Sequence, residues 1–481
     1  MPTKRTIIAS LFWKYCERLG TQLTQFVVSV VLARILAPDD FGVVALALIF
    51  IAIANIFVQS GLNTALIQKK DADDLDFSSV FWASLGISFI AYAVFFFAAP
   101  FIADFYGKEI LVPVTRVLAL TIPIGVLNSI QNAYVSRHMM FKKLFYRSFG
   151  AMIPSGIAGI VAALYGAGIW AIVIQQISIS ILNIAILWVV VPWHPSFKFS
   201  GTRLKSLFSF GWKLLCSSLL DACYSNLRGL IIGKVFTPAD LAYYNRGDHF
   251  PNLVVNNINH SIQSVMLPSL SAYQDDRPMM KKLMRRSIVT TSFLILPMMA
   301  GLAVLAKPLI LFLLGEKWLP CAPFVQIYCF IYAFRPIHTS NLSAINAMGR
   351  SDIFLKLEII KEFVGIGILL GSLFLFNSPL GIAYGAALAT LISAFINAHP
   401  NKKLLQYGYL EQMKDIFPSF LLSGFMAVCL HLFSQINIPI YISAILQIPL
   451  GIIIYTGIAK ILHFECLDYL VNTIKGFRHG R

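Results

Sequence analysis

Long apolar runs recur along the whole chain, and they limit its possible folds more than any other feature. Hydrophobic residues make up 58% of the 481 residues and charged residues 12%, whereas about 25% of an average soluble domain is charged. Such a chain cannot cover its apolar side chains with polar ones, so lipid must solvate most of its surface. A helix needs about 20 mostly apolar residues to span a bilayer, and the runs predict about fourteen such helices. They are expected near 11–36, 41–67, 78–103, 112–136, 146–166, 168–191, 207–233, 249–270, 287–306, 322–347, 353–376, 379–398, 416–434 and 439–460.

The distribution of positive charge predicts the orientation of these helices. A net charge of +16 raises nucleic acid as a partner for a soluble protein. With a cytoplasmic N-terminus, however, 25 of the 38 Lys and Arg fall in inner loops and termini, and six fall outside. This bias follows the positive-inside rule and places both termini in the cytoplasm, so no nucleic-acid partner is needed. The longest outer connection is expected from Lys234 to Asp248.

Two internal echoes predict a duplicated six-helix unit. Arg34, Pro38 and Asp40 recur 200 residues later as Lys234, Pro238 and Asp240. Pro123, Asn128 and Arg137 recur 213 residues later as Pro336, Asn341 and Arg350. Because six is an even number, the repeats have the same orientation, and a substrate site is expected between them near the bilayer midplane.

The predicted fold is therefore an all-α polytopic membrane protein of two parallel six-helix lobes plus two C-terminal helices. The N-terminal lobe is expected over 1–206, the C-terminal lobe over 207–400, and the added helices and tail over 401–481.

Seven cations remain inside the expected spans. A charge at the centre of a membrane helix costs about 2.5–3.5 kcal/mol on insertion scales, so such groups normally face a bundle interior or a wet cavity. Arg335 and Asp221 lie nearest to helix centres. The seven are Lys14, Arg18, Arg116, Lys213, Arg228, Arg335 and Lys361.

Helical spacing arranges several of these charges in stripes. One stripe is Lys14, Glu17, Arg18, Thr21 and Gln25; a second is Lys213, Ser217, Asp221, Tyr224 and Arg228; a third is Asn55, Gln59 and Asn63. We interpret them as the lining of a cationic cavity.

The polar residues expected to line this cavity are Gln25, Asn55, Gln59, Asn128 and Asn341. The alternative is internal pairing that serves only helix packing, with Glu17 bound to Lys14 or Arg18 and Asp221 bound to Lys213 or Arg228. For Arg335 the alternative is hydrogen bonding to carbonyls freed by Pro336.

The sequence contains no metal-ligand cluster, no phosphate-binding glycine loop and no nucleophile with its base. It therefore predicts no metal, no cofactor and no enzymatic activity.

The first third of the chain is similar to a known family. The segments that carry the resemblance are Phe12–Gly20, Leu32–Leu36, Pro38–Gly42, Ala65–Gln68 and Ser78–Trp82, with Tyr243–Gly247 further on. They resemble the polysaccharide transporter family, the Wzx-like flippases of the superfamily that also contains multidrug and toxin extrusion proteins.

The resemblance implies two lobes in a V and transport by alternating access, coupled to a gradient of H+ or Na+. The implied substrate is an undecaprenyl-diphosphate-linked oligosaccharide, moved across a bacterial inner membrane for lipopolysaccharide, capsule or exopolysaccharide. Membrane lipid and polysaccharide polymerase or assembly proteins are the implied partners. In this sequence, the residues suited to the cationic role are Arg18, Lys213, Arg228, Arg335 and Lys14. Glu17 and Asp221 are the residues suited to bind a coupling cation or to hold those basic groups in place.

A cation-extruding antiporter of the same fold is the alternative function. Organic cations favour acidic and aromatic walls, whereas the intramembrane cations here outnumber the acids.

Overall fold

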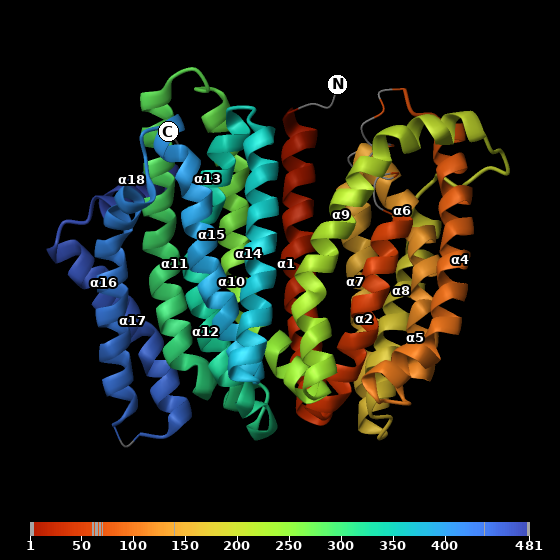
Figure 1. The fold of residues 1–481 in the computed structure, drawn as a ribbon, viewed down its shortest axis with the longest axis horizontal. Coiled ribbons are helices and arrows are strands. Elements are labelled where there is room, and N and C mark those ends of the chain that lie inside the picture. Colours follow the sequence, from red (N-terminus) through yellow and green to blue (C-terminus); the bar gives the residue numbers. More distant parts are fainter. Residues whose placement is uncertain are drawn as a thin grey trace. The chain divides into compact units, whose positions relative to one another are not determined.

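The computed structural model describes the backbone of residues 4–59, 62, 66, 69, 71–138, 140–436 and 438–478. The side chains of 4–11, 59, 209, 210, 213, 214, 260, 471 and 473–478 lie outside the described set. Within these ranges every regular element is a helix, as the apolar runs predict. Inside each of two units the helices run alongside one another (Figure 1).

The two units are Met1–Ala242 and Tyr243–Arg481. The division falls inside one helix, α10 (Pro238–Ser271). Helix α9, the seventh long helix of the chain, packs against α2 and α4 and so belongs by its contacts to the first unit. The lobe boundaries expected at residues 206 and 400 stay a prediction.

The first unit is built on the packing of α1 against α7, and of α7 against α8. Its helices are α1 (Lys4–Ile35), α2 (Pro38–Gln59), α4 (Asp74–Tyr106), α5 (Leu111–Ala119), α6 (Thr121–Arg137), α7 (Phe141–Leu164), α8 (Ile169–Val190) and α9 (Gly201–Val235).

The second unit is built around α11, which packs against α12, α13, α16 and α17. After α10, its elements are α11 (Arg277–Leu313), the short 3-10 helix η1 (Glu316–Cys321), α12 (Ala322–Ala333), α13 (Arg335–Ala347), α14 (Ser351–Phe376), α15 (Pro379–Leu404), α16 (Tyr409–Ser434), α17 (Ile440–Ile461) and α18 (Glu465–Arg478).

Ten of the described helical segments are long and apolar enough to cross a membrane. The four other expected spans correspond to α1, α9, α10 and the α12–α13 pair, which are less apolar because they carry the polar stripes and Arg335. The chain is thus a multi-pass, all-α membrane protein, and its helices are consistent with the expected fourteen spans.

One boundary differs from its prediction. We expected an outer loop from Lys234 to Asp248, but α9 ends at Val235 and α10 begins at Pro238. The hydroxyl of Thr237 caps the start of α10 by accepting a hydrogen bond from the backbone N–H of Asp240 at 3.1 Å, and the Asp240 carboxylate accepts from the backbone N–H of Thr237 at 3.1 Å. A side chain that caps the free N–H groups of the first turn favours a helix start. Tyr243–Asp248 therefore form helix rather than loop.

Both repeated prolines coincide with a break in a helix. The fourth expected span divides into α5 and α6 just before Pro123, and the tenth divides into α12 and α13 just before Pro336. Proline has no backbone N–H and its ring clashes with the preceding turn, so it interrupts the helical ladder. The repeated prolines of the sequence thus correspond to a repeated helix break in the structure.

The connection between α8 and α9 is fixed to the start of α4. Trp82 donates its indole N–H to the carbonyl of Ser196 at 2.8 Å, and its ring stacks on Phe197 at 5.3 Å. The hydroxyls of Ser78 and Ser79 accept from the backbone N–H groups of Ser196 and Ser200, at 3.0 and 2.9 Å. Four side-chain contacts therefore hold residues 196–200 on the first unit.

Charged groups complete this attachment. Asp73 and Asp76 form a capping box at the start of α4, and Arg203 of α9 pairs with both carboxylates at 2.5 and 3.5 Å. The hydrogen bond from Arg203 holds the pKa of Asp73 below its ordinary value. Lys69 pairs with the fully buried Asp76 at 2.7 Å. The acidic segment that precedes α4 is thus a structural clamp.

Candidate functional site

The break between α12 and α13 positions a cation within a predicted membrane span. Arg335 is the first residue of α13, next to the buried Pro336. Its side chain is exposed, and it forms no hydrogen bond or direct ion pair with any described residue. The alternative in which Arg335 bonds to freed carbonyls is therefore not what the structure contains.

A carboxylate lies on the helix opposite this break. Asp248 of α10 accepts a hydrogen bond from the Tyr332 hydroxyl at 2.8 Å and from the Asn252 amide at 3.2 Å. Asn252 in turn accepts from Asn256. The positive charge of Arg335 acts on Asp248 across a distance too long for a direct ion pair. Tyr332, Arg335 and Asp248 therefore form one polar cluster inside the second unit.

Close packing of α10 on α12 sets the position of Asp248. A methyl group built on Gly247 would lie 2.3 Å from Cβ of Phe324, so only glycine allows this approach. The rings of Tyr244 and Tyr328 pack edge to face with centroids 5.5 Å apart. Both rings are buried, so they extend the packed contact between α10 and α12.

The first unit contains a different acid–arginine pair. Glu17 of α1 lies 3.6 Å from Arg147 of α7 and accepts a hydrogen bond from Ser148 at 2.8 Å. Arg147 donates to Asn132 at 2.6 Å and to Ser148 at 3.1 Å. The two charged side chains are only 21% and 15% exposed. Glu17 therefore pairs with α7, and not with Lys14 or Arg18 as the packing alternative supposed.

The rest of the α1 stripe is spread over a partly open face. Lys14 is exposed, with its ammonium 5.4 Å from the centre of the Phe141 ring. Arg18 is partly buried and Gln25 is exposed. The structure therefore brings Lys14 close to α7 and leaves Gln25 on the surface.

The α9 stripe is open as well. Asp221 is exposed and has no ion pair with a described residue. Arg228 is partly buried and lies over the Tyr224 ring at 5.6 Å. The side chain of Lys213 lies outside the described set. Pairing of Asp221 with Arg228, the packing alternative for this stripe, is absent from these described side chains.

The expected polar lining residues have different surroundings. Asn55 and Asn128 are partly buried, and Gln59 has no described side chain. The Oδ1 atom of Asn128 is buried without a hydrogen-bond partner.

Asn341 is fully buried. Its amide exchanges hydrogen bonds with Gln412 at 2.8 and 3.0 Å and accepts from Asn401 at 2.7 Å. We expected Asn341 to line a cavity. Its amide instead joins α13 to α15 and α16, because the side chains of Asn401 and Gln412 already satisfy its hydrogen bonds.

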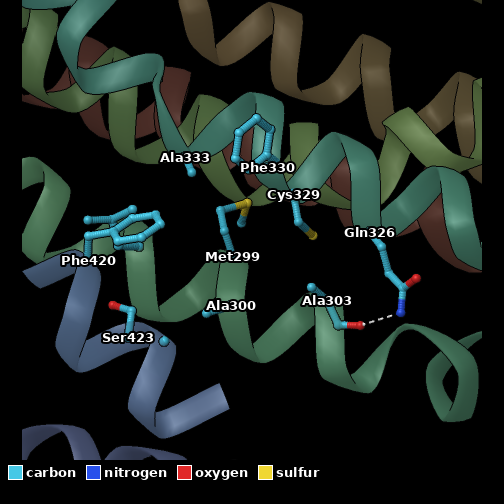
Figure 2. Close-up of a pocket in the computed structure, with 11 residues that line it drawn as sticks. Met299, Ala300, Ala303, Gln326, Cys329, Phe330, Ala333, Phe420 and Ser423 are labelled. Atoms are coloured by element: carbon cyan, nitrogen blue, oxygen red, sulfur yellow. Dashed lines mark hydrogen bonds between the residues drawn. The ribbon is translucent and has the colours of Figure 1, made fainter. Parts of the chain in front are cut away.

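A separate cavity of about 220 Å³ lies between α11, α12 and α16 (Figure 2). Most of its lining is apolar, including Met299, Phe330, Ala333 and Phe420. Gln326 turns its amide toward the carbonyl of Ala303 and donates to it at 3.2 Å. Its walls therefore suit hydrocarbon rather than phosphate or sugar hydroxyls.

Sequence reasoning missed Asp248, Tyr332 and Arg147 as candidate site residues. The sequence places Asp248 in the expected outer loop and Arg147 among the 25 cations of the inner loops, since each stands near the end of an apolar run. The aromatic segment before Asp248 is a usable signal, because Tyr243 and Tyr244 lie three and four residues after Asp240, in the first turns of the helix. Among the described residues, no three His, Cys, Asp or Glu side chains form a group suited to a metal ion.

Three relatives that are similar in sequence have names that refer to the biosynthesis of polysaccharides. The succinoglycan biosynthesis transport protein ExoT of Rhizobium meliloti is 25% identical to this chain, over 82% of this chain and 77% of its own length. The lipopolysaccharide biosynthesis protein WzxC of Escherichia coli is 23% identical over 84% of this chain and 82% of its own. The teichuronic acid biosynthesis protein TuaB of Bacillus subtilis is 26% identical over 62% of each chain.

Solved structures share the fold. The lipid II flippase MurJ in an inward closed conformation superposes with a TM-score of 0.77 at 16% identity, covering 94% of this chain and 99% of its own. An inward-facing multidrug resistance MATE transporter gives 0.58 at 14% identity, covering 85% and 95%. At these identities the likeness establishes the fold alone.

A match to the family described as polysaccharide biosynthesis protein extends over residues 31–323. It covers more than half of the chain and includes both repeated proline-aspartate motifs, at Pro38 and Pro238. This multi-pass membrane protein therefore belongs to the polysaccharide biosynthesis protein family.

Proposed function

We propose that this protein is a flippase that moves undecaprenyl-diphosphate-linked oligosaccharide from the inner to the outer leaflet of a bacterial inner membrane. The observation that carries the proposal is the exposed guanidinium of Arg335 at a proline break inside the second unit. A planar, permanently charged guanidinium suits a diphosphate because it offers parallel N–H donors to two oxygens.

The relatives support this choice of substrate. ExoT is named as a transport protein for succinoglycan biosynthesis, and WzxC and TuaB are named for the biosynthesis of lipopolysaccharide and teichuronic acid. All three names concern cell-surface polysaccharides, whose lipid-linked precursors combine a charged diphosphate, a polar glycan and an apolar chain.

Other features of the chain suit the rest of such a substrate. The amide side chains of Asn252 and Asn256 on α10 offer hydrogen-bond groups for sugar hydroxyls. The apolar cavity beside α12 suits a prenyl chain, and its lining residue Ala333 precedes Arg335 by two positions. The proposal further includes cytoplasmic termini, coupling to H+ or Na+, and contact with polysaccharide polymerase or assembly proteins.

Charge weighs against extrusion of organic cations. At the α12–α13 break the exposed group is the cation Arg335, while the carboxylate of Asp248 is already held by two neutral donors. A site that presents a free positive charge repels a cationic drug and attracts an anion.

Deletion of the gene in its own host tests the proposal. We expect lipid-linked oligosaccharide to accumulate in the inner leaflet, measured as protection from a glycosidase added outside spheroplasts. Unchanged leaflet distribution together with new sensitivity to cationic drugs would overturn the flippase and favour the extruder.

A substitution tests the role of Arg335. Arg335→Ala is expected to lower glycan export on the order of a hundredfold, as for loss of one partner in a charged, hydrogen-bonded contact. Arg335→Lys keeps the charge but not the paired donors and should retain part of the export. Lys307→Ala, which removes an exposed cation from α11, is the matched control. Equal export by Arg335→Ala and the control would remove Arg335 from the site.

A further inference from the structure

Both oxygens of the Asp248 carboxylate are held by neutral groups. Oδ1 accepts from the Tyr332 hydroxyl at 2.8 Å, and Oδ2 accepts from the Asn252 amide at 3.2 Å. These bonds fix the position of the negative charge without using a cation. Among the described side chains, Asp248 therefore does not belong to a direct ion pair like the one that Glu17 forms with Arg147.

The charged and titratable groups around Asp248 can be named. Tyr332 faces it from α12 and Arg335 from α13, while the hydroxyl of Tyr244 on α10 acts on Tyr332. Arg246 lies over the ring of Trp318, with 5.4 Å from guanidinium to ring centre, and its charge acts on His249. Within this set, Arg335 is the cation whose charge acts on Asp248.

Arg335 and Asp248 thus attract one another without contact. The Asp248 carboxylate is partly buried, and a partly buried charge is screened less than one on the surface, so it attracts the exposed Arg335 guanidinium without direct contact. An anion that binds to the exposed guanidinium must overcome the field of the fixed carboxylate. The same carboxylate repels the anion once it is bound.

We propose that Asp248 is a fixed internal anion that competes with the substrate diphosphate for Arg335 and so lowers its affinity and permits its release. The inference rests on the proposed flippase function and deepens it. Asp248 acts on the substrate through Arg335, so it is a positioning residue. A transporter must bind its substrate weakly enough to let it go, and a lone guanidinium in an apolar bundle would hold a diphosphate too tightly.

Proton binding makes the competition adjustable. When Asp248 takes up a proton from solvent it loses its charge, and Arg335 becomes fully available to the anion. By linkage, a bound anion at Arg335 favours the protonated carboxylate to the same extent. The affinity of the wild-type protein relative to a charge-free variant therefore depends on pH.

The test measures binding of geranylgeranyl diphosphate to the full-length protein in lipid nanodiscs at pH 8 and pH 5.5. Asp248→Asn removes the charge and keeps the shape. It is expected to bind the probe about tenfold more tightly than wild type at pH 8, the equivalent of one pKa unit. At pH 5.5 the two proteins should differ less. Comparison at equal pH cancels the titration of the probe itself.

Export distinguishes this role from a structural one. Asp248→Asn should bind more tightly and yet export glycan more slowly, because release is impaired. A structural defect would weaken binding and export together. Asp275→Asn removes an exposed carboxylate next to the start of α11, and it should leave both measurements unchanged.

A second variant keeps the charge and alters its partner. Tyr332→Phe removes the donor to Oδ1 and leaves the carboxylate freer to act on Arg335, so binding should weaken about threefold, less than the effect of the full charge. Binding of Asp248→Asn equal to or weaker than wild type at pH 8 overturns the inference. If Asp248→Asn does not fold, tighter or unchanged binding by Tyr332→Phe overturns it.

The failure of this inference can be told from failure of the proposed function. If Arg335→Ala binds the probe as well as wild type does, the anion site itself is wrong. If Arg335→Ala loses binding while Asp248→Asn matches wild type, the anion site stands and only the competition is lost.

Discussion

The two helices broken by repeated prolines differ in what they present at the break. In the first unit α5 ends at Ala119 before Pro123, and in the second unit α12 ends at Ala333 before Pro336. The residue before the proline is the fully buried Ile122 in one case and the exposed Arg335 in the other. Duplication preserved the break and changed its chemistry.

The same change extends to the neighbouring positions. Tyr332 corresponds to the buried Ala119 by the 213-residue offset. Asp248 corresponds to Leu48, which stands at the same distance from Pro38 as Asp248 does from Pro238. All three members of the second-unit cluster therefore have apolar counterparts. The repeat accounts for the two helix breaks, and the positions where the second repeat is polar and the first is apolar indicate the candidate site.

Exchange of the residues before the prolines should have the largest effect. Ile122→Arg places a charge at a position with no exposed surface, and on insertion scales this costs about 3 kcal/mol. We expect little folded protein in fluorescence-detected size-exclusion chromatography. Arg335→Ile, the reverse exchange, should fold normally because its position is exposed. Normal folding of both variants would mean that the two breaks are equivalent.

Neutralisation of the first-unit pair is expected to act on stability. Glu17→Gln leaves Arg147 partly buried without its charge partner, at a cost of about 2 kcal/mol, below the range for fully buried pairs. The melting temperature in detergent should fall. Adding Arg147→Gln should restore part of the loss, since the unpaired charge is then removed. A single variant as stable as wild type would show that the pair is not structural.

The repeated asparagines provide a matched pair with a smaller difference. Asn341→Ala strands the amides of Gln412 and Asn401, so about 1–2 kcal/mol of stability should be lost. Asn128→Ala removes an amide whose Oδ1 has no described partner, and its thermal stability should stay close to wild type. Equal losses for both would contradict the different hydrogen bonding of the two sites.

The smallest effect is expected at the clamp before α4. The depressed pKa of Asp73 means that its contribution to folding is present above its unfolded value near 3.9 and is lost as pH falls through the folded value. Between pH 8 and 5 the hydrogen exchange of residues 196–200 should therefore stay constant. Asp73→Asn should raise it slightly at every pH. A rise in wild-type exchange already at pH 6 would point to a different titrating group.

The helices and their breaks could be predicted from the sequence, because apolar runs and repeated prolines act locally. The site could be predicted only in part. Arg335 can be recognised from the sequence because a charge inside a membrane helix is costly. Asp248 cannot, because the polar residues around it in α10 are typical of a loop. Pairing of Glu17 with Arg147 joins residues 130 positions apart, and no local spacing encodes it.

The attachment of residues 196–200 to α4 has a consequence for experiments that divide the chain. A duplicated protein is ordinarily split, tagged or permuted at the junction between its halves, where exposed loops tolerate change. Here residues 196–200, just before the lobe boundary predicted at residue 206, supply backbone groups to Ser78, Ser79 and Trp82. A cut or insertion there would unseat part of the first unit, so an affinity tag or a split site belongs instead in the exposed turn at Tyr273–Asp276.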